Sequence, residues 1–181
     1  MKNLDVTIDI TTKRRYNDVV IKKVTTKRDA VWPTVKHHSK SKFNFTEVII
    51  MNKIVEFLQA NPVQYLGTVG RDGKAKCRPF MFCLEKGGKL WFCTNNTKDV
   101  YKDMQANPEI EVSVSSPEYA WIRLHGKAVF ENNMEVKEAC MLNPIVKGQY
   151  ETAENPIFEV FYIENPHGVI ADFSGNPPYE F

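Results

Sequence analysis

The stretch with the clearest chemical potential is a polar break between two apolar segments. Residues 90–104 read LWFCTNNTKDVYKDM, so an apolar run gives way to small polar and basic residues and then resumes at helical spacing. A strand that ends here and leads into a helix presents hydroxyls, amides, an ammonium group and unpaired helix N–H groups at one point. Together these groups can hold a phosphate. The same residues are also ordinary helix caps, and the loop alone does not separate the two interpretations.

A second candidate, Arg78, lies in the preceding apolar segment, AKCRPFMFCLE at residues 75–85. A charged side chain among apolar neighbours needs a partner or an exit to solvent. If this segment pairs with residues 90–94 through the turn at 86–89, Arg78 and Thr94 lie toward the same end of the hairpin. The partner of Arg78 is then either a bound anion or a surface carboxylate.

Other kinds of catalytic site do not emerge from the pattern. We find no Ser-His-Asp ordering with a nucleophile turn and no paired carboxylates in an apolar setting. The four cysteines, Cys77, Cys83, Cys93 and Cys140, form no CxxC pair and have no histidine at metal-ligand spacing, so we expect reduced thiols and no metal. His125, the one histidine inside the core pattern, is expected to pack or to face solvent.

The elements that must position these residues follow from periodicity and turn signals. A short helix is expected at residues 52–62, capped by Asn52, and an Asp-Gly turn at 71–74 joins the first two strands. The expected strands are 64–70, 75–85, 90–94, 109–116, 119–131, 157–163 and 168–173, with the fifth relieved at Gly126. Helices are expected after the polar break and at 134–142, the latter stopped by Pro144. Seven strands with short helices predict a closed or nearly closed antiparallel barrel.

Charge divides the chain into two parts. Residues 1–50 hold 11 Lys and Arg against 5 Asp and Glu, which leaves 13 against 17 in residues 51–181. We therefore expect a basic N-terminal extension at 1–50 and a barrel domain at 51–181. The extension is either a solvated appendage or an arm for nucleic acid.

The lengths of the apolar runs indicate whether the protein enters a membrane or is secreted. No run approaches the roughly 18 consecutive apolar residues of a membrane span, and the N-terminus lacks the apolar region of a secretory signal. The expectation is a cytoplasmic protein that does not enter a membrane.

An ordered set of motifs carries a family resemblance. RPF at 78–80, FCTNNTK at 92–98, a helix running to NP, an alternating strand and WIRLHGKA at 121–128 resemble the split-barrel flavoproteins related to pyridoxamine 5'-phosphate oxidase, over about residues 51–175. The resemblance implies a mainly β fold, an antiparallel split β-barrel of the FMN-binding type, and a homodimer with FMN at the interface. The implied cofactor-binding residues are Arg78, Pro79, Phe80, Thr94, Asn95, Thr97, Lys98 and Trp121. Of these, Trp121 would approach the flavin of the other subunit, although a core role is the common use of such a tryptophan.

The chain also departs from the oxidase itself. The oxidase has its loop lysine later, near Val100, and closes with an Arg- and Trp-containing signature, whereas this chain ends DFSGNPPYEF. We therefore exclude vitamin B6 as the substrate. The general-stress-protein and nitroimidazole-reductase groups are similar, but Cys93 stands where the reductases often carry a histidine. The expected function is FMN-dependent oxidoreduction of an unknown small molecule, in which the flavin supplies the chemistry. The alternatives are a flavin- or haem-binding module without turnover, and nucleic-acid binding.

Overall fold

A computed structural model describes residues 45–181 of the chain. The chain divides into two units, residues 1–40 and 41–181, and the described residues belong to the second. The basic clusters of the predicted N-terminal extension, and with them the nucleic-acid alternative, lie outside the described residues. The division at residue 50 stays a prediction.

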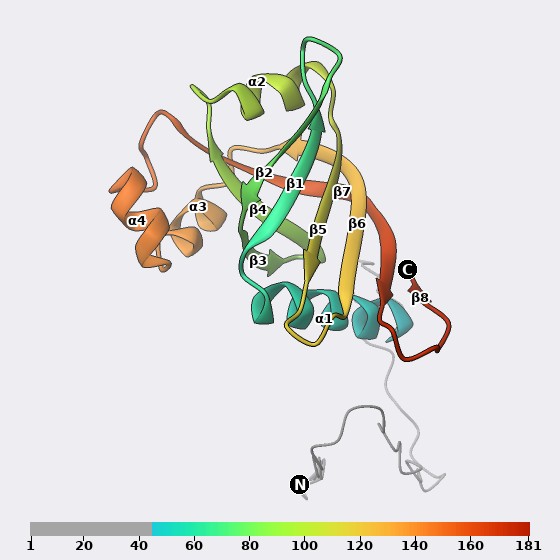
Figure 1. The fold of residues 1–181 in the computed structure, drawn as a ribbon. Coiled ribbons are helices and arrows are strands. Elements are labelled where there is room, and N and C mark those ends of the chain that lie inside the picture. Colours follow the sequence, from blue (N-terminus) through green and yellow to red (C-terminus); the bar gives the residue numbers. More distant parts are fainter. Residues whose placement is uncertain (1–44) are drawn as a thin grey trace, which may run out of the picture. The chain divides into compact units, whose positions relative to one another are not determined.

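The described residues form a sheet of antiparallel strands flanked by short helices (Figure 1). In chain order the elements are α1 (Phe45–Ala60), β1 (Gln64–Val69), β2 (Ala75–Phe80), β3 (Phe82–Lys86), β4 (Lys89–Asn95), α2 (Asp99–Ala106), β5 (Glu109–Ser115), β6 (Trp121–Phe130), α3 (Met134–Cys140), α4 (Pro144–Tyr150), β7 (Phe158–Ala171) and β8 (Tyr179–Glu180). None of the helices in this part of the chain has the length and apolar character that crossing a membrane requires.

The strand order is β2-β1-β5-β6-β7-β4-β3, with β8 added to β7, and every pairing is antiparallel. β2 and β3 follow each other in the sequence but lie at the two ends of this path. The sheet therefore curls into a barrel that no ladder closes between its ends. Figure 1 shows α1 across one end of the curled sheet and α2 across the other, with α3 and α4 on the outside. The predicted antiparallel split barrel is confirmed.

Several local predictions are also confirmed. The Asp-Gly turn connects β1 and β2, and Gly73 adopts a φ of 74° that other residues rarely take. The relief expected at Gly126 is present, because the register between β6 and β7 shifts between His125 and Lys127. A Cβ on Gly126 would lie 2.6 Å from the carbonyl oxygen of Glu164, so only glycine fits there without movement.

Helix boundaries were harder to predict. α1 begins at Phe45 rather than at Asn52, because Ile50 and Met51 pack against the barrel interior and extend the helix upstream. The helix expected at 134–142 ends at Cys140. Pro144 does not merely stop it but opens α4, where its missing N–H costs nothing at the first helical position.

Strand boundaries differ for a topological reason. The single strand predicted at 75–85 is divided at Met81, because the segment leaves β1 after Phe80 and joins β4 from Phe82 onward. The strands predicted at 157–163 and 168–173 are one long strand, β7, which pairs with β4 through its first five residues and with β6 along most of its length.

Two hydrophobic cores lie on opposite sides of β4. The barrel core comprises the buried residues Ile54, Leu58, Leu66, Phe82, Leu90, Phe92, Val100, Met104, Ile110, Val112, Val114, Ile122, Leu124, Ala128, Phe161 and Ile163. The outer core comprises Trp91, Val136, Cys140, Val146, Tyr150, Phe158 and Val160. Leu90 and Phe92 face the first and Trp91 the second, which explains why β4 is apolar without alternation.

Candidate functional site

The loop between β4 and α2 is shaped by one asparagine. The Asn95 Oδ1 accepts hydrogen bonds from the Thr97 backbone N–H at 2.7 Å and from the Thr97 hydroxyl at 2.6 Å. The Lys98 N–H donates to the Asn95 carbonyl at 3.1 Å. Lys98 is the extended N-cap of α2, and its side chain does not cap the helix. Thr97 and Lys98 therefore stand exposed at the start of α2 while Asn95, which is buried, holds the turn.

Asn96 fixes this loop to β7. Its backbone N–H donates to the Ile157 carbonyl at 3.0 Å, and its side-chain amide donates to the Pro156 carbonyl at 2.9 Å and to the Glu159 Oε1 at 3.0 Å. Three bonds to one neighbouring segment make the loop a preformed feature of the fold.

Thr94, the residue before this turn, carries an unusual hydroxyl. The side chain is 2% exposed, and its Oγ1 is the buried side-chain polar atom that has no hydrogen-bond partner within residues 45–181. An unsatisfied buried hydroxyl costs about 1–3 kcal/mol. Such a group at the entry to a loop that exposes the Lys98 ammonium indicates a position that a ligand can satisfy.

Arg78 has protein partners on both sides. Its Nη1 donates to the Thr68 hydroxyl at 2.8 Å, and its Nη2 lies 3.8 Å from the Asp103 Oδ2. Of the two partners expected from the sequence, a carboxylate is therefore present, but it is the buried Asp103 of α2 and not a surface group. The contact places Arg78 beside the helix that the polar loop begins.

Asp103 also binds the turn between β1 and β2. The Arg71 backbone N–H and Nε each donate to Asp103 Oδ1 at 3.1 Å, and Arg71 Nη2 contacts Asp99 at 2.7 Å. These donors, the backbone N–H first, hold the pKa of the Asp103 carboxyl below its usual value despite burial. The sequence analysis missed Asp103, although a carboxylate on the apolar helical face of Val100 and Met104 is a signal that could have identified it.

The remaining predicted residues are spread over the barrel. Phe80 is half-buried against the barrel core, 5.9 Å from Phe161 between ring centroids, and Pro79 is exposed. Trp121 stands at the turn between β5 and β6, paired with Ser115, at the end of the barrel away from α2 (Figure 1). One chain thus brings Thr94, Asn95, Thr97 and Lys98 together, places Arg78 of β2 against Asp103 of the helix that follows them, and leaves Trp121 apart.

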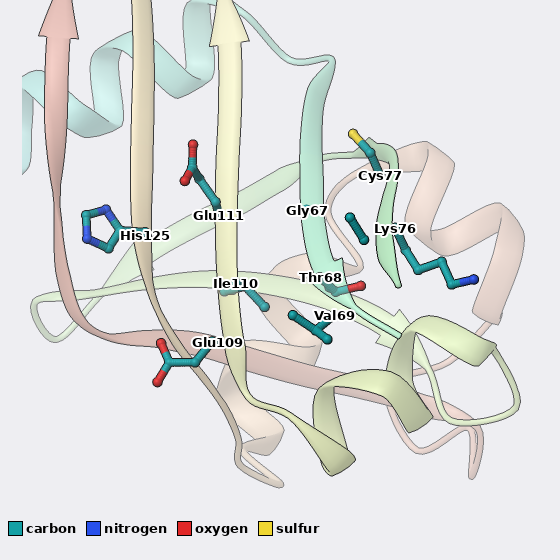
Figure 2. Close-up of a pocket in the computed structure, with 10 residues that line it drawn as sticks. Gly67, Thr68, Val69, Lys76, Cys77, Glu109, Ile110, Glu111 and His125 are labelled. Carbon is teal, nitrogen blue, oxygen red and sulfur yellow. The ribbon is translucent and has the colours of Figure 1, made fainter. Parts of the chain in front are cut away.

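A hollow of about 560 Å³ lies on the outer face of the sheet. Figure 2 shows Gly67 of β1 at its floor, with Cys77 of β2 on one side and Glu111 and His125 on the other. No predicted cofactor residue lines it. His125 faces solvent, one of the two expectations for it, and its ring centroid lies 3.4 Å from that of His167 on β7. Across residues 45–181 no three His, Cys, Asp or Glu side chains are grouped to hold a metal ion.

Comparison with known proteins gives consistent matches. A sequence model of the pyridoxamine 5'-phosphate oxidase family matches residues 50–164. A solved NimC/NimA family protein from Clostridium acetobutylicum is 32% identical, with a TM-score of 0.65, over 72% of this chain and 92% of its own. No curated protein matches the chain.

Two more distant structures share the fold. A pyridoxamine 5'-phosphate oxidase-related, FMN binding protein from Nostoc punctiforme is 15% identical, with a TM-score of 0.56, over 75% of this chain and 88% of its own. A heme binding protein from Mycobacterium smegmatis is 14% identical, with a TM-score of 0.58, over 72% of this chain and 56% of its own. At these identities the likeness establishes the split-barrel fold and nothing further.

Proposed function

Because the chain belongs to the pyridoxamine 5'-phosphate oxidase family, we propose that it is an FMN-binding flavoprotein that acts as an oxidoreductase on a small molecule other than vitamin B6. The observation that carries the proposal is the unsatisfied Thr94 hydroxyl, buried at the entry to a preformed loop that also exposes Thr97 and Lys98. The FMN-binding relative from Nostoc punctiforme supports the choice of cofactor.

The residues of the loop fit a phosphate in distinct roles. The Thr94 hydroxyl and the Lys98 ammonium would contact it directly. The Thr97 hydroxyl donates to the Asn95 Oδ1 and would have to turn away from this acceptor to donate to the phosphate, while the Thr97 N–H keeps the turn in shape. The first N–H groups of α2 would add the partial positive charge of a helix start. Asp99 in that first turn opposes an anion, but Arg71 pairs with it at 2.7 Å and offsets its charge.

Arg78 would supply a second cation. A guanidinium has five N–H donors, and the Thr68 hydroxyl takes one at 2.8 Å. The distance of 3.8 Å to Asp103 is longer than a hydrogen bond, so Arg78 keeps donors for a phosphate oxygen while Asp103 fixes its direction. When bound, the flavin supplies the electron-transfer chemistry, and the chain orients it.

The position of Trp121 supports a homodimer. Within one chain Trp121 lies at the opposite end of the barrel from the loop, so it would meet a flavin held by a second copy. The outer face of β1 exposes Tyr65 by 49% and Val69 by 37%, beside the hollow. Exposed apolar residues around a concave surface are a suitable subunit contact. Light scattering should report a dimer with FMN bound, and a flavin-loaded monomer would contradict this part of the proposal.

An absorbance spectrum of the purified protein followed by FMN titration tests the cofactor. We expect a flavin spectrum that is bleached by reduction and returns on reoxidation. A haem spectrum would favour the haem-binding alternative, and flavin that no nicotinamide donor reduces would favour a module without turnover.

A pair of variants tests the phosphate loop. We expect Lys98→Ala combined with Thr94→Val to weaken FMN binding by about 2–4 kcal/mol, from one charge-assisted and one neutral hydrogen bond. Lys102→Ala, an exposed lysine one turn later on α2, is the matched control and should leave affinity unchanged. Equal affinity in all three proteins would refute the phosphate assignment.

A further inference from the structure

Three of the four cysteines gather at the outer core. Cys83 on β3 and Cys93 on β4 are half-buried against it, and Cys140 of α3 is one of its buried members. The Cys83 thiol donates to the Met81 carbonyl at 3.9 Å, and Cys93 and Cys140 lie near enough to influence its pKa. All four cysteines are free thiols. The fourth, Cys77, lies apart from these three and is exposed on β2.

A β-bulge brings two of these thiols together. The pairing of β3 with β4 runs from Phe82 opposite Phe92 to Leu84 opposite Trp91, so Cys83 is the extra residue on β3. A bulged residue leaves the regular ladder and its side chain is re-aimed. Phe92 faces the barrel core, and the next residue, Cys93, therefore faces the outer core on the same side as Cys83.

The two thiols differ in acidity. The neighbouring Cys83 thiol lowers the pKa of Cys93, and the nearby Lys98 charge lowers it further, in opposition to burial. The neighbouring thiols of Cys140 and Cys93, together with burial, raise the pKa of Cys83 well above its usual value. The thiolate is the reactive form of cysteine, so Cys93 is the more reactive thiol. Cys83 is the protonated neighbour that can form a disulfide with Cys93 once Cys93 is oxidised.

We propose that Cys93 and Cys83 form a redox-sensitive pair, in which a peroxide oxidises Cys93 and Cys83 then closes a disulfide between β4 and β3. In the first step the Cys93 sulfur bonds to a peroxide oxygen, the O–O bond breaks, and the departing oxygen takes a proton to leave as water. In the second step the Cys83 sulfur attacks the Cys93 sulfenic acid, the S–O bond breaks, and the Cys83 proton leaves with the hydroxyl as a second water. Two thiols lose two electrons and hydrogen peroxide gains them.

The position of Cys93 means that the disulfide would affect the polar loop whether or not a cofactor is bound. Cys93 directly precedes Thr94, so a bond to β3 would fix the end of β4 from which the polar loop departs. The disulfide would also remove the thiolate beside Lys98. Oxidation of these two thiols does not depend on FMN binding.

Peptide mapping of the full-length reduced protein tests the pair. The protein is treated with hydrogen peroxide, remaining thiols are alkylated, and tryptic peptides are analysed without reduction. Lys86 and Lys89 lie between the two cysteines, so trypsin separates them unless they are bonded. We expect a cross-linked peptide lacking two hydrogen atoms that joins residues 77–86 to residues 90–98, with Cys140 alkylated. Its fragment ions should place the bond on Cys83 and the alkyl group on Cys77, which lies on the same tryptic peptide because Pro79 protects Arg78 from cleavage. A Cys83–Cys140 bond, or Cys93 still alkylated after Cys77 has oxidised, would overturn the assignment.

Variants separate the two roles. Cys83→Ala should let Cys93 accumulate as a sulfenic acid that dimedone captures, because the second thiol is gone. Cys93→Ala should leave Cys83 reduced, and Cys77→Ala should form the cross-link at the parent rate. If Cys83→Ala yields no sulfenic acid on Cys93 while its melting curve matches the parent, Cys93 is not the reacting thiol. If a variant fails to fold, the peptide map of the parent protein still shows which two cysteines are joined.

Discussion

The two sides of β4 face cores of different chemistry. The buried members of the barrel core within residues 45–181 are aliphatic and aromatic residues and Met104, with no cysteine. The outer core buries Cys140 and has Cys83 and Cys93 packed against it. The barrel core lies inside the curled sheet, whereas the outer core is covered by α3 and α4, helices of seven residues each. Helices this short depend on tertiary packing for their stability. We therefore expect α3 and α4 to unfold locally before the barrel does, which would expose the thiols beneath them.

A matched pair of phenylalanines should give the largest effect and tests this difference directly. Phe92 in the barrel core and Phe158 in the outer core are both fully buried, so replacing either by alanine should cost about 3–5 kcal/mol of unfolding free energy. Phe92→Ala should speed amide exchange throughout the sheet, because Phe92 packs on Phe80, Phe82 and Phe161. Phe158→Ala should speed exchange mainly in α3 and α4. Identical exchange patterns would show that the two cores unfold as one.

Two threonines sharpen the description of the barrel side. Thr68→Val removes the acceptor of a charged hydrogen bond from Arg78 and should cost about 1.5–3 kcal/mol. Thr94→Val replaces an unpaired buried hydroxyl by a methyl group and should stabilise the cofactor-free protein by about 1–3 kcal/mol. Urea unfolding without flavin measures both. Destabilisation by Thr94→Val would show that the hydroxyl already has a partner in solution.

The pH dependence of stability should separate the same two regions. The folded pKa of Asp103 is depressed, so its contribution is present above the unfolded value of about 3.9 and is lost as pH falls through the folded pKa. Burial raises the pKa of Tyr150 in the outer core, so its contribution is present below about 10 and is lost at higher pH. Asp103→Asn should therefore reduce the loss of stability in acid, and Tyr150→Phe the loss in alkali. Urea titrations across pH check both, and a swapped pattern would contradict the assignments.

Helix capping over the outer core should give the smallest effect. The Asn143 side chain accepts from the Ile145 N–H at 2.9 Å at the start of α4, and Asn143→Ala should cost about 1 kcal/mol. Because α4 covers the outer core, the variant should also alkylate faster at Cys140. Asn133→Ala, which uncaps α3, is the matched comparison. Unchanged alkylation in both variants would mean that the helices do not control access to the thiols.

Local sequence signals predicted much of this fold, and nonlocal pairing explains the rest. Periodicity located β1, β4, β5 and β6 closely, and the Asp-Gly turn located the start of β2, because these features depend on adjacent residues. The break at Met81 was not predictable in the same way, since it depends on which strands lie at the two ends of the sheet.

The candidate site shows the same limit. The polar loop was recognised as a unit because its residues are contiguous, and its binding role stays a prediction. The pairing of Arg78 with Asp103 joins residues far apart in the chain. The thiol cluster depends on a bulge whose register the sequence does not display. That the cysteines adjoin the outer core and not the barrel core is therefore known only when the strand pairing is known.

The long strand β7 also determines the order in which a nascent chain can fold. β4 is synthesised before α2, β5, β6, α3 and α4, yet its second neighbour in the sheet is β7, with Thr94 opposite Glu159. At about 5–20 residues per second the ribosome leaves that edge of β4 unpaired for several seconds, along with the free edge of β6. A stalled or truncated product that ends before Phe158 would expose the two strand edges that β7 covers in the complete fold, and open edges favour aggregation. Rapid synthesis of β7 should therefore shorten the time during which the nascent barrel can aggregate through the edges of β4 and β6.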